Sequence, residues 1–324
     1  MRLATFNVES LDLPPRAKLP IEDRAEALRP VLARLDADIL CLQEVNGQHV
    51  PDRPERVLLA LDLLLEGTPY ATFERISTSG PDGLGVADTH NLVILSRFPI
   101  RSRREVCHDL VPQPLYRMAT ADPRPSEPEP VTFDRPLLVA DIELPSGAVL
   151  TVINVHLRAP LAAAIPGQKL SAFVWRTVGG WAEGYFLASM RRAGQALELR
   201  LLLEELFEAD PHRLIAVAGD FNAEDYDTAL RIAIGAEEDT GNGALSPRSL
   251  VLLDRAIPAD RRWTILHHGR PQMLDHILVS RSLYGHVREI EVHNEILGDE
   301  LVGFGKGAPS PGSYHAPLVV ELAL

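Results

Sequence analysis

The sequence predicts an α/β protein in which two packed β-sheets carry helices on their outer faces. Apolar runs of strand length alternate with helical patterns along the 324 residues, and no repeat or linker interrupts them. Apolar residues make up 46% of the chain and charged residues 24%, a composition typical of a globular protein with an adequate core. We expect a single domain over residues 1–324.

The amino-terminal part alternates strands and helices. An apolar strand is expected at 2–6, and the segment 22–35 places its apolar residues on one face, as an amphipathic helix does. The short apolar run 39–43 is typical of a buried strand. The segment 54–65 begins with a favourable early proline and continues with helical spacing.

The rest of the chain continues the mixture, with its longest helical pattern at 189–208. A proline, serine and glycine turn at 145–147 joins two of the later strands into a hairpin. The further strands are expected at 70–77, 91–95, 137–144, 149–155, 214–218, 277–279 and 318–322.

Two segments do not fit this alternation. Residues 111–136 are rich in proline and polar side chains, which predicts an irregular surface loop. Residues 158–186 form an insertion that holds two of the three tryptophans. An insertion of this length favours a lid or a specificity wall, or alternatively an extra packing layer or a dimer contact.

Polar residues follow the apolar runs at five places along the chain. A polar side chain at the end of a buried strand is held by a rigid scaffold, which is what catalysis requires. These strand-end residues are Asn7, Glu44, His156, Asp220 with Asn222, and His315.

Taken in order, these segments resemble the endonuclease/exonuclease/phosphatase superfamily. Its members are metal-dependent phosphoesterases that include deoxyribonucleases, abasic-site endonucleases, inositol-polyphosphate phosphatases and sphingomyelinases. The resemblance spans residues 1–324 and implies a four-layer sandwich of two mixed sheets with helices outside. The matching residues are Asn7, Glu44, the segment 91–99 (NLVILSRFP), His156, Asp220, Asn222, Asp275 and His315.

The resemblance also implies a metal and a base. It places Glu44 on a divalent cation, Mg²⁺ or Mn²⁺, and Asn7 beside the metal and the phosphate. Oxygen ligands of this kind are those that both cations prefer. In the family Asp220 is the candidate base and Asn222 positions the phosphate or the nucleophile, whereas the residues alone also allow an Asx turn after the strand.

The imidazoles take the remaining roles that the resemblance implies. Asp275 orients His315, and His156 donates hydrogen bonds to the phosphoryl oxygens.

One position departs from the family pattern. The family has Asp before the last His, and this chain has Tyr314. We expect the site to carry a single cation on Glu44 or to recruit Glu9 or His276, with Glu9 facing solvent as the alternative.

Substrate contacts are expected from both the strand ends and the insertion. The candidate substrate-binding residues are Asn91, Arg158, Trp175 and Trp181. Aromatic side chains over a charged floor favour an apolar ester and exclude a DNA duplex.

The net charge of −13 repels polyanions, which weighs against long duplex nucleic acid as a partner. The leading hypothesis is a phosphoesterase for a small or lipid-like phosphodiester, with the preference among monoesters, diesters and triesters left open. The alternatives are a nuclease for abasic or single-stranded DNA and a non-catalytic binding module that retains the fold.

Composition also sets expectations for compartment and assembly. Two cysteines give no disulfide framework, and neither a signal segment nor a run of membrane-spanning length is visible. A cytoplasmic enzyme is therefore expected, although a trimmed signal is an alternative, and the oligomeric state is left open.

Overall fold

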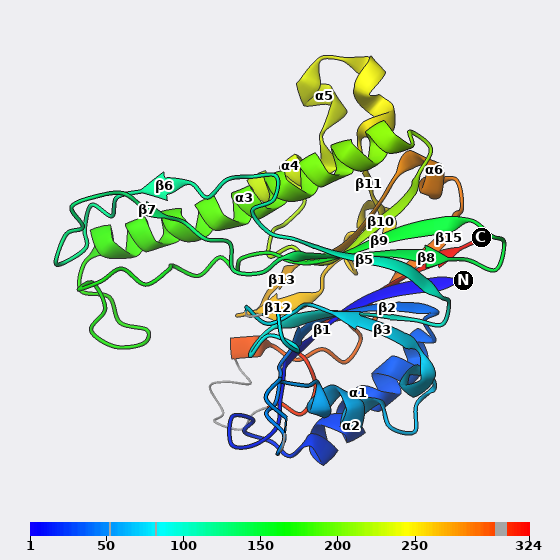
Figure 1. Ribbon diagram of the computed structural model, residues 1–324, viewed down its shortest axis with the longest axis horizontal. Coiled ribbons are helices and arrows are strands. Elements are labelled where there is room, and N and C mark those ends of the chain that lie inside the picture. Colours follow the sequence, from blue (N-terminus) through cyan, green and yellow to red (C-terminus); the bar gives the residue numbers. More distant parts are fainter. Residues whose placement is uncertain (52, 82, 302–309) are drawn as a thin grey trace.

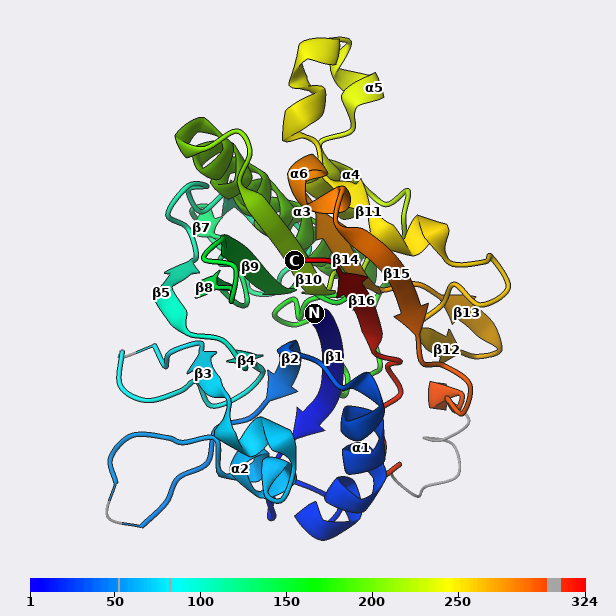
Figure 2. The ribbon, with the colours of Figure 1, turned by 90° about the vertical axis from the view of Figure 1, so that its right-hand side faces the viewer.

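The computed structural model contains two six-stranded mixed sheets, with helices on the outer face of each (Figure 1). It describes residues 1–51, 53–81, 83–301 and 310–324. Figure 2, seen from the side of both termini, shows one sheet above the other. The prediction of a four-layer α/β arrangement is confirmed.

The first sheet has the strand order β15-β16-β1-β2-β4-β3. The β1 and β2 strands run parallel, whereas β16 and β4 run antiparallel to their neighbours β1 and β2. Its strands are β1 (Arg2–Leu11), β2 (Ile39–Val45), β3 (Glu74–Ser77), β4 (Asn91–Ser96), β15 (Val287–Val292) and β16 (Leu318–Leu322).

The second sheet has the order β11-β14-β10-β9-β8-β5, with β9 and β10 parallel. Its strands are β5 (Ile100–Val106), β8 (Leu137–Glu143), β9 (Val149–His156), β10 (Leu214–Asp220), β11 (Val251–Leu252) and β14 (Asp275–Val279). Two short pairs lie outside the sheets: β6 (Leu115–Tyr116) with β7 (Glu129–Pro130), and β12 (Ile265–His267) with β13 (Arg270–Gln272).

Helices form the outer layers (Figure 1). The α1 helix (Ile21–Leu35) and the α2 helix (Leu59–Leu65) cover the first sheet, and the α3 helix (Val178–Ala209) and the α4 helix (Thr228–Ile234) cover the second. The shorter helices are α5 (Glu237–Thr240), α6 (Arg281–Tyr284), and the 3₁₀ turns η1 (Pro69–Thr72), η2 (Gly243–Arg248) and η3 (Leu253–Ala256). No helix in the described ranges is both long and apolar enough to cross a membrane.

The alternation of side chains along the strands produces three hydrophobic cores, one between the two sheets and one between each sheet and its helices. Residues of one parity, such as Leu3 and Cys41, point to the opposite sheet, and their neighbours point to the helices. The two sheets also share a buried polar contact, in which Gln43 Nε2 donates to Asn154 Oδ1 at 2.8 Å. The burial expected for Cys41 is present.

Several element boundaries differ from the sequence-based expectation. The helix expected at 54–65 begins at Leu59, and of the strand expected at 70–77 only Glu74–Ser77 is extended, since residues 69–72 form a 3₁₀ turn. The longest helix begins at Val178 instead of 189. The β5 and β15 strands were not expected, because charged residues make up at least half of each sequence.

The two irregular segments pack against each other beside α3. Within 111–136 only two-residue strands form, and a small apolar cluster joins this segment to the insertion and to the first turns of α3. The Glu183 carboxylate of α3 accepts hydrogen bonds from the Tyr116 hydroxyl and the Thr120 amide. The side of the insertion that faces residues 111–136 and α3 therefore packs as an extra layer, as one of the two interpretations expects.

Gly219 is a backbone position that the fold requires. Its φ is +149°, and a Cβ there would lie 2.0 Å from the Val155 carbonyl oxygen of the adjacent strand. We expect Gly219→Ala to lower the free energy of unfolding by about 3 kcal/mol or more in urea denaturation. The Gly147→Ala control, where a Cβ meets nothing within 4 Å, is expected to cost about 1 kcal/mol. Equal losses in the two variants would contradict this account of Gly219.

Candidate active site

Strand register brings the polar residues to one edge of the two sheets. The parallel strands β1, β2, β9 and β10 end there, and the antiparallel strands β14 and β16 begin there. Asp220 is paired with His156 across one ladder and with Asp275 across the other. Residues far apart in sequence therefore meet because each occupies the same end of its strand.

Asn7 links the two sheets through its side-chain amide. Its Nδ2 donates to Glu44 Oε1 and to Asp220 Oδ2, both at 3.1 Å. Its Oδ1 already accepts the Glu9 amide at 2.9 Å. In this orientation the Asn7 side-chain amide positions the two carboxylates, and its Oδ1 keeps a second lone pair beyond the bond from Glu9.

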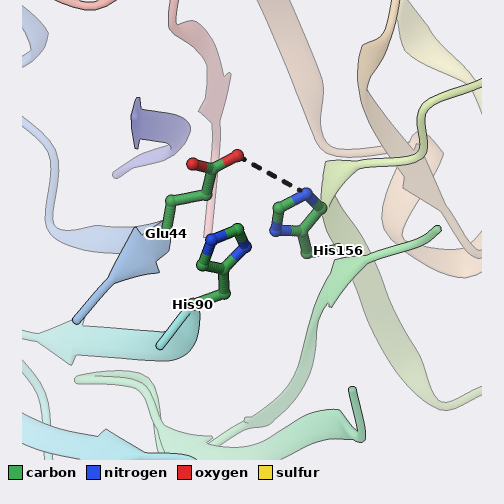
Figure 3. Close-up of side chains that lie close together, drawn as sticks. All are labelled: Glu44, His90 and His156. Carbon is green, nitrogen blue, oxygen red and sulfur yellow. Dashed lines mark ion pairs between the residues drawn. The ribbon is translucent and has the colours of Figure 1, made fainter. Parts of the chain in front are cut away.

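Glu44 faces a group of imidazoles. Its Oε1 lies 3.7 Å from His156 Nε2, with His90 alongside (Figure 3), and its Oε2 accepts the Ser10 amide at 3.0 Å. Burial by itself would raise the pKa of Glu44, but the nearby imidazoles and the Asn7 amide outweigh it and lower this pKa to about 2. The carboxylate is therefore ionised at neutral pH.

Asp220 is a buried carboxyl with mixed surroundings. Its Oδ1 accepts the Asn222 amide at 2.8 Å, and its Oδ2 lies 3.5 Å from His156 Nε2. Burial, together with the charge of Asp275, raises the pKa of Asp220 to about 7. The bond from the Asn222 amide is the Asx turn that the residues alone allow, and the Asn222 side chain donates to the Leu157 carbonyl at 3.1 Å.

Asp275 and His315 form the pair that was expected. Asp275 Oδ2 lies 2.8 Å from His315 Nδ1. Burial opposes protonation of the imidazole, but the charge and hydrogen bond of Asp275 prevail and raise the pKa of His315 to about 10. His315 is thus an imidazolium next to the carboxyl groups of Asp275 and Asp220.

Left-handed backbone conformations gather around the site. Such conformations cost non-glycine residues roughly 1–3 kcal/mol and persist where the surrounding structure enforces them. The residues with φ between 47° and 61° at or beside the site are Glu9, Ser10, Glu44, His90 and Asn222.

Sequence reasoning missed two residues, His90 and Arg135. The rings of His90 and His156 stack with centroids 6.0 Å apart and planes 6° from parallel. Arg135 Nη2 lies 2.7 Å from His90 Nδ1, and because guanidinium only donates, this nitrogen is the acceptor. The neutral ring then carries its proton on Nε2. His90 could have been found, because it directly precedes a buried strand.

Several candidates are not brought to the site. Asn91 is fully buried, and its amide is used by the Val45 and Ala87 backbone, so its expected role in substrate binding is corrected to a structural one. His276 is also buried, between Asp254 and the Ala223 carbonyl, and cannot be recruited as a ligand.

The tryptophans lie with the insertion. Trp175 packs in the small apolar cluster under Lys169, and Trp181 is 45% exposed on the first turns of α3. Arg158 forms an ion pair with Asp134 at 3.6 Å, next to Arg135. This ion pair connects the beginning of the insertion to the segment that carries Arg135.

The Glu9 side chain is bound by the backbone of Tyr314, the position at which this chain departs from the family pattern. The Tyr314 amide donates to Glu9 Oε2 at 2.8 Å, and burial raises the pKa of this carboxyl. Glu9 therefore lies near the last His of the site, within range of the charge of Glu44.

The donor set fits a divalent cation. One potential ligand atom each of Glu44, His90 and His156 lies within 4.8 Å of the others, as does one each of Asp220, Asp275 and His315. Because the tautomer that Arg135 selects leaves His90 no free ring nitrogen, the Glu44 carboxylate supplies the oxygen ligands of the first group. Two buried atoms, His156 Nδ1 and Asp275 Oδ1, have no hydrogen-bond partner among the described residues. Carboxylate oxygens suit Mg²⁺ and Mn²⁺, and imidazole is compatible with Mn²⁺ and softer metals.

Comparisons with known structures agree on the fold. A 3′ phosphatase from Neisseria, bound to a product DNA hairpin, is 17% identical with a TM-score of 0.57, and each chain is covered to 100%. A mannosyl-6-phosphatase from Bacteroides thetaiotaomicron is 15% identical with a TM-score of 0.60, again with 100% coverage of both chains. An AP endonuclease from Archaeoglobus fulgidus is 16% identical with a TM-score of 0.53 and the same coverage. Curated protein sequences give no match.

The strand-end residues described above lie inside the part of the chain that a family model covers. The model of the endonuclease/exonuclease/phosphatase family matches residues 4–315. Its members are hydrolases that act on phosphoester bonds and use divalent metals. The chain therefore belongs to the endonuclease/exonuclease/phosphatase family.

Proposed function

We propose that this protein is a divalent-metal-dependent phosphoesterase that hydrolyses a small or lipid-like phosphodiester by in-line attack of an activated water. The observation that carries the proposal is the bridge formed by Asn7, whose amide lies 3.1 Å from both Glu44 and Asp220. It holds an ionised carboxylate suited to a metal beside a carboxyl whose pKa is near neutrality.

Each residue has a separate task in this reaction. Asp220 takes the proton of the attacking water, and the amide of Asn7 keeps its Oδ2 in place. His315, held by Asp275, offers an N–H donor and positive charge to the phosphoryl oxygens. His156 offers an N–H donor without charge, because burial lowers its pKa well below the ordinary value. Mg²⁺ or Mn²⁺ bound at Glu44 supplies Lewis-acid stabilisation of the developing charge.

The substrate class rests on charge and on the insertion. The net charge of −13 opposes binding along a polyanion, whereas a small ester needs only local cations. Exposed aromatic residues of the insertion suit an apolar group. Structural likeness at 14–19% identity does not select among phosphatase and nuclease substrates.

A substrate panel tests this proposal. Initial rates with Mg²⁺ are compared for bis(p-nitrophenyl) phosphate, p-nitrophenyl phosphate, lysophospholipid, and abasic, single-stranded and duplex DNA. We expect the highest kcat/KM for small or lipid diesters. A preference for abasic or single-stranded DNA would support the nuclease alternative, and binding without turnover of any ester would support a binding module.

His90 is expected to donate its Nε2 proton to the substrate. His90→Ala and Arg135→Met should each lower kcat/KM by about 10²-fold. The first variant removes the N–H donor, and the second removes the hydrogen bond that keeps the His90 proton on Nε2. His212→Ala, in the exposed turn before β10, serves as the control and should leave the rate unchanged. An unaffected rate in His90→Ala with an intact circular dichroism spectrum would refute this role.

A further inference from the structure

The molecule carries a projecting apolar tip, formed by residues 161–186. Figure 1 shows α3 running past the strands at the end of the molecule opposite both termini, with the preceding segment looping beside it. Large apolar side chains of the tip are exposed: Leu161 69%, Leu170 62%, Phe173 94%, Val174 51%, Val178 80%, Trp181 45%, Tyr185 40% and Phe186 48%.

Hydrogen bonds within the tip fix its backbone. Thr177 caps α3 by accepting the Gly180 amide at 2.9 Å, and its hydroxyl donates to Gln168 Oε1 at 2.7 Å. A bridge between Lys169 and Trp175 closes the loop ahead of the helix. These contacts fix the backbone, so the outward direction of the apolar side chains is built into the fold.

The helical part presents one apolar stripe. Val178, Trp181 and Tyr185 are spaced three and four residues apart and therefore lie on one face of α3. The rings of Trp181 and Tyr185 stack with centroids 5.7 Å apart. An exposed apolar face of this kind marks an interaction surface.

Charge indicates which partner this surface fits. Within 161–186 the basic residues are Lys169 and Arg176, and the one acid, Glu183, is buried and hydrogen-bonded. This local excess of positive charge stands out in a chain with a net charge of −13. Aromatic and aliphatic side chains flanked by Lys and Arg are the combination that inserts into an anionic lipid interface.

We propose that residues 161–186 dock the protein onto an anionic phospholipid surface. The tip lies at the end of the molecule where β1, β2, β9 and β10 finish, so docking brings a membrane to the side on which the active site lies (Figure 1). A second copy of the chain fits less well, because it would bring the same positive charges together.

Vesicle co-sedimentation tests the proposal without reference to catalysis. The full chain should bind mixed phosphatidylcholine–phosphatidylserine vesicles more tightly than phosphatidylcholine alone, with a blue shift of tryptophan emission. Phe173→Ser with Val178→Ser should weaken binding at least about tenfold. Lys169→Glu with Arg176→Glu should remove the preference for phosphatidylserine.

The controls separate docking from other causes. Ile296→Ser and Tyr226→Ser, whose side chains are 87% and 80% exposed elsewhere, should bind as the wild type does. Asp220→Asn should also bind normally, so an inactive enzyme leaves the docking test intact. Equal binding by the wild type and the Phe173/Val178 variant overturns the proposal. The proposal is also overturned if the wild type does not bind vesicles but dimerises with increasing concentration, and the Phe173/Val178 variant abolishes this dimerisation.

Discussion

Asp220→Asn is expected to lower kcat on a phosphodiester by about 10³-fold while KM changes little. The substitution keeps the shape of the side chain but removes the group that accepts the proton of water, and such general bases contribute about 10²–10⁴-fold. Steady-state kinetics on bis(p-nitrophenyl) phosphate measure the effect. The exposed Asp260→Asn serves as the control and should behave as the wild type does. A kcat within a few-fold of the wild type would remove Asp220 from the role of base.

The pH profile gives a second test of the same residue. Burial and the neighbouring charge of Asp275 raise the pKa of Asp220 to about 7, so the ionised base forms as pH rises and kcat/KM should rise with it through that pH. Asp275→Asn removes the second of these causes, and the rising limb should move to lower pH. The same substitution removes the negative charge that raises the pKa of His315, so the alkaline limb should also move to lower pH. Limbs that stay in place would contradict this assignment.

Glu44→Gln is the other variant with a large expected effect. It should abolish measurable turnover, a loss of at least about 10³-fold, because the neutral amide cannot replace an ionised carboxylate on a metal. Isothermal calorimetry with Mn²⁺ should show weakened binding at the same time. The fold should persist, because Gln matches Glu in size and its one side-chain oxygen can still accept a hydrogen bond from either Asn7 or Ser10.

The control for this variant is Glu66→Gln, an exposed residue after α2. Its metal affinity and turnover should equal those of the wild type. Unchanged Mn²⁺ binding in Glu44→Gln, with a native circular dichroism spectrum, would contradict a metal site at Glu44 and assign the metal to Asp220 and Asp275 instead.

The sequence predicts the core of the site because strand ends are visible in it. Glu44, His156 and Asp220 each close an apolar run, and parallel strands that end together must bring their last residues together. The order of the layers came from the family resemblance, since periodicity alone does not pair strands. The division into one domain stays a prediction.

The parts that failed depend on tertiary contacts. Asn91 also begins a strand, but its amide is consumed by the turn before it, which no local pattern reveals. Arg135 reaches His90 from the end of a proline-rich segment, 45 residues away in sequence. The start of α3 was placed too late because glycines and aromatics replace good helix formers there, and packing of Glu183 and Leu187 stabilises those turns instead.

The central claim is that hydrolysis of a small diester requires a divalent metal at this site. The most direct measurement is the initial rate on bis(p-nitrophenyl) phosphate as free Mg²⁺ or Mn²⁺ is titrated into chelator-treated protein. We predict no turnover in chelator and a saturable return of activity with either metal. Full activity in the presence of chelator would contradict the account.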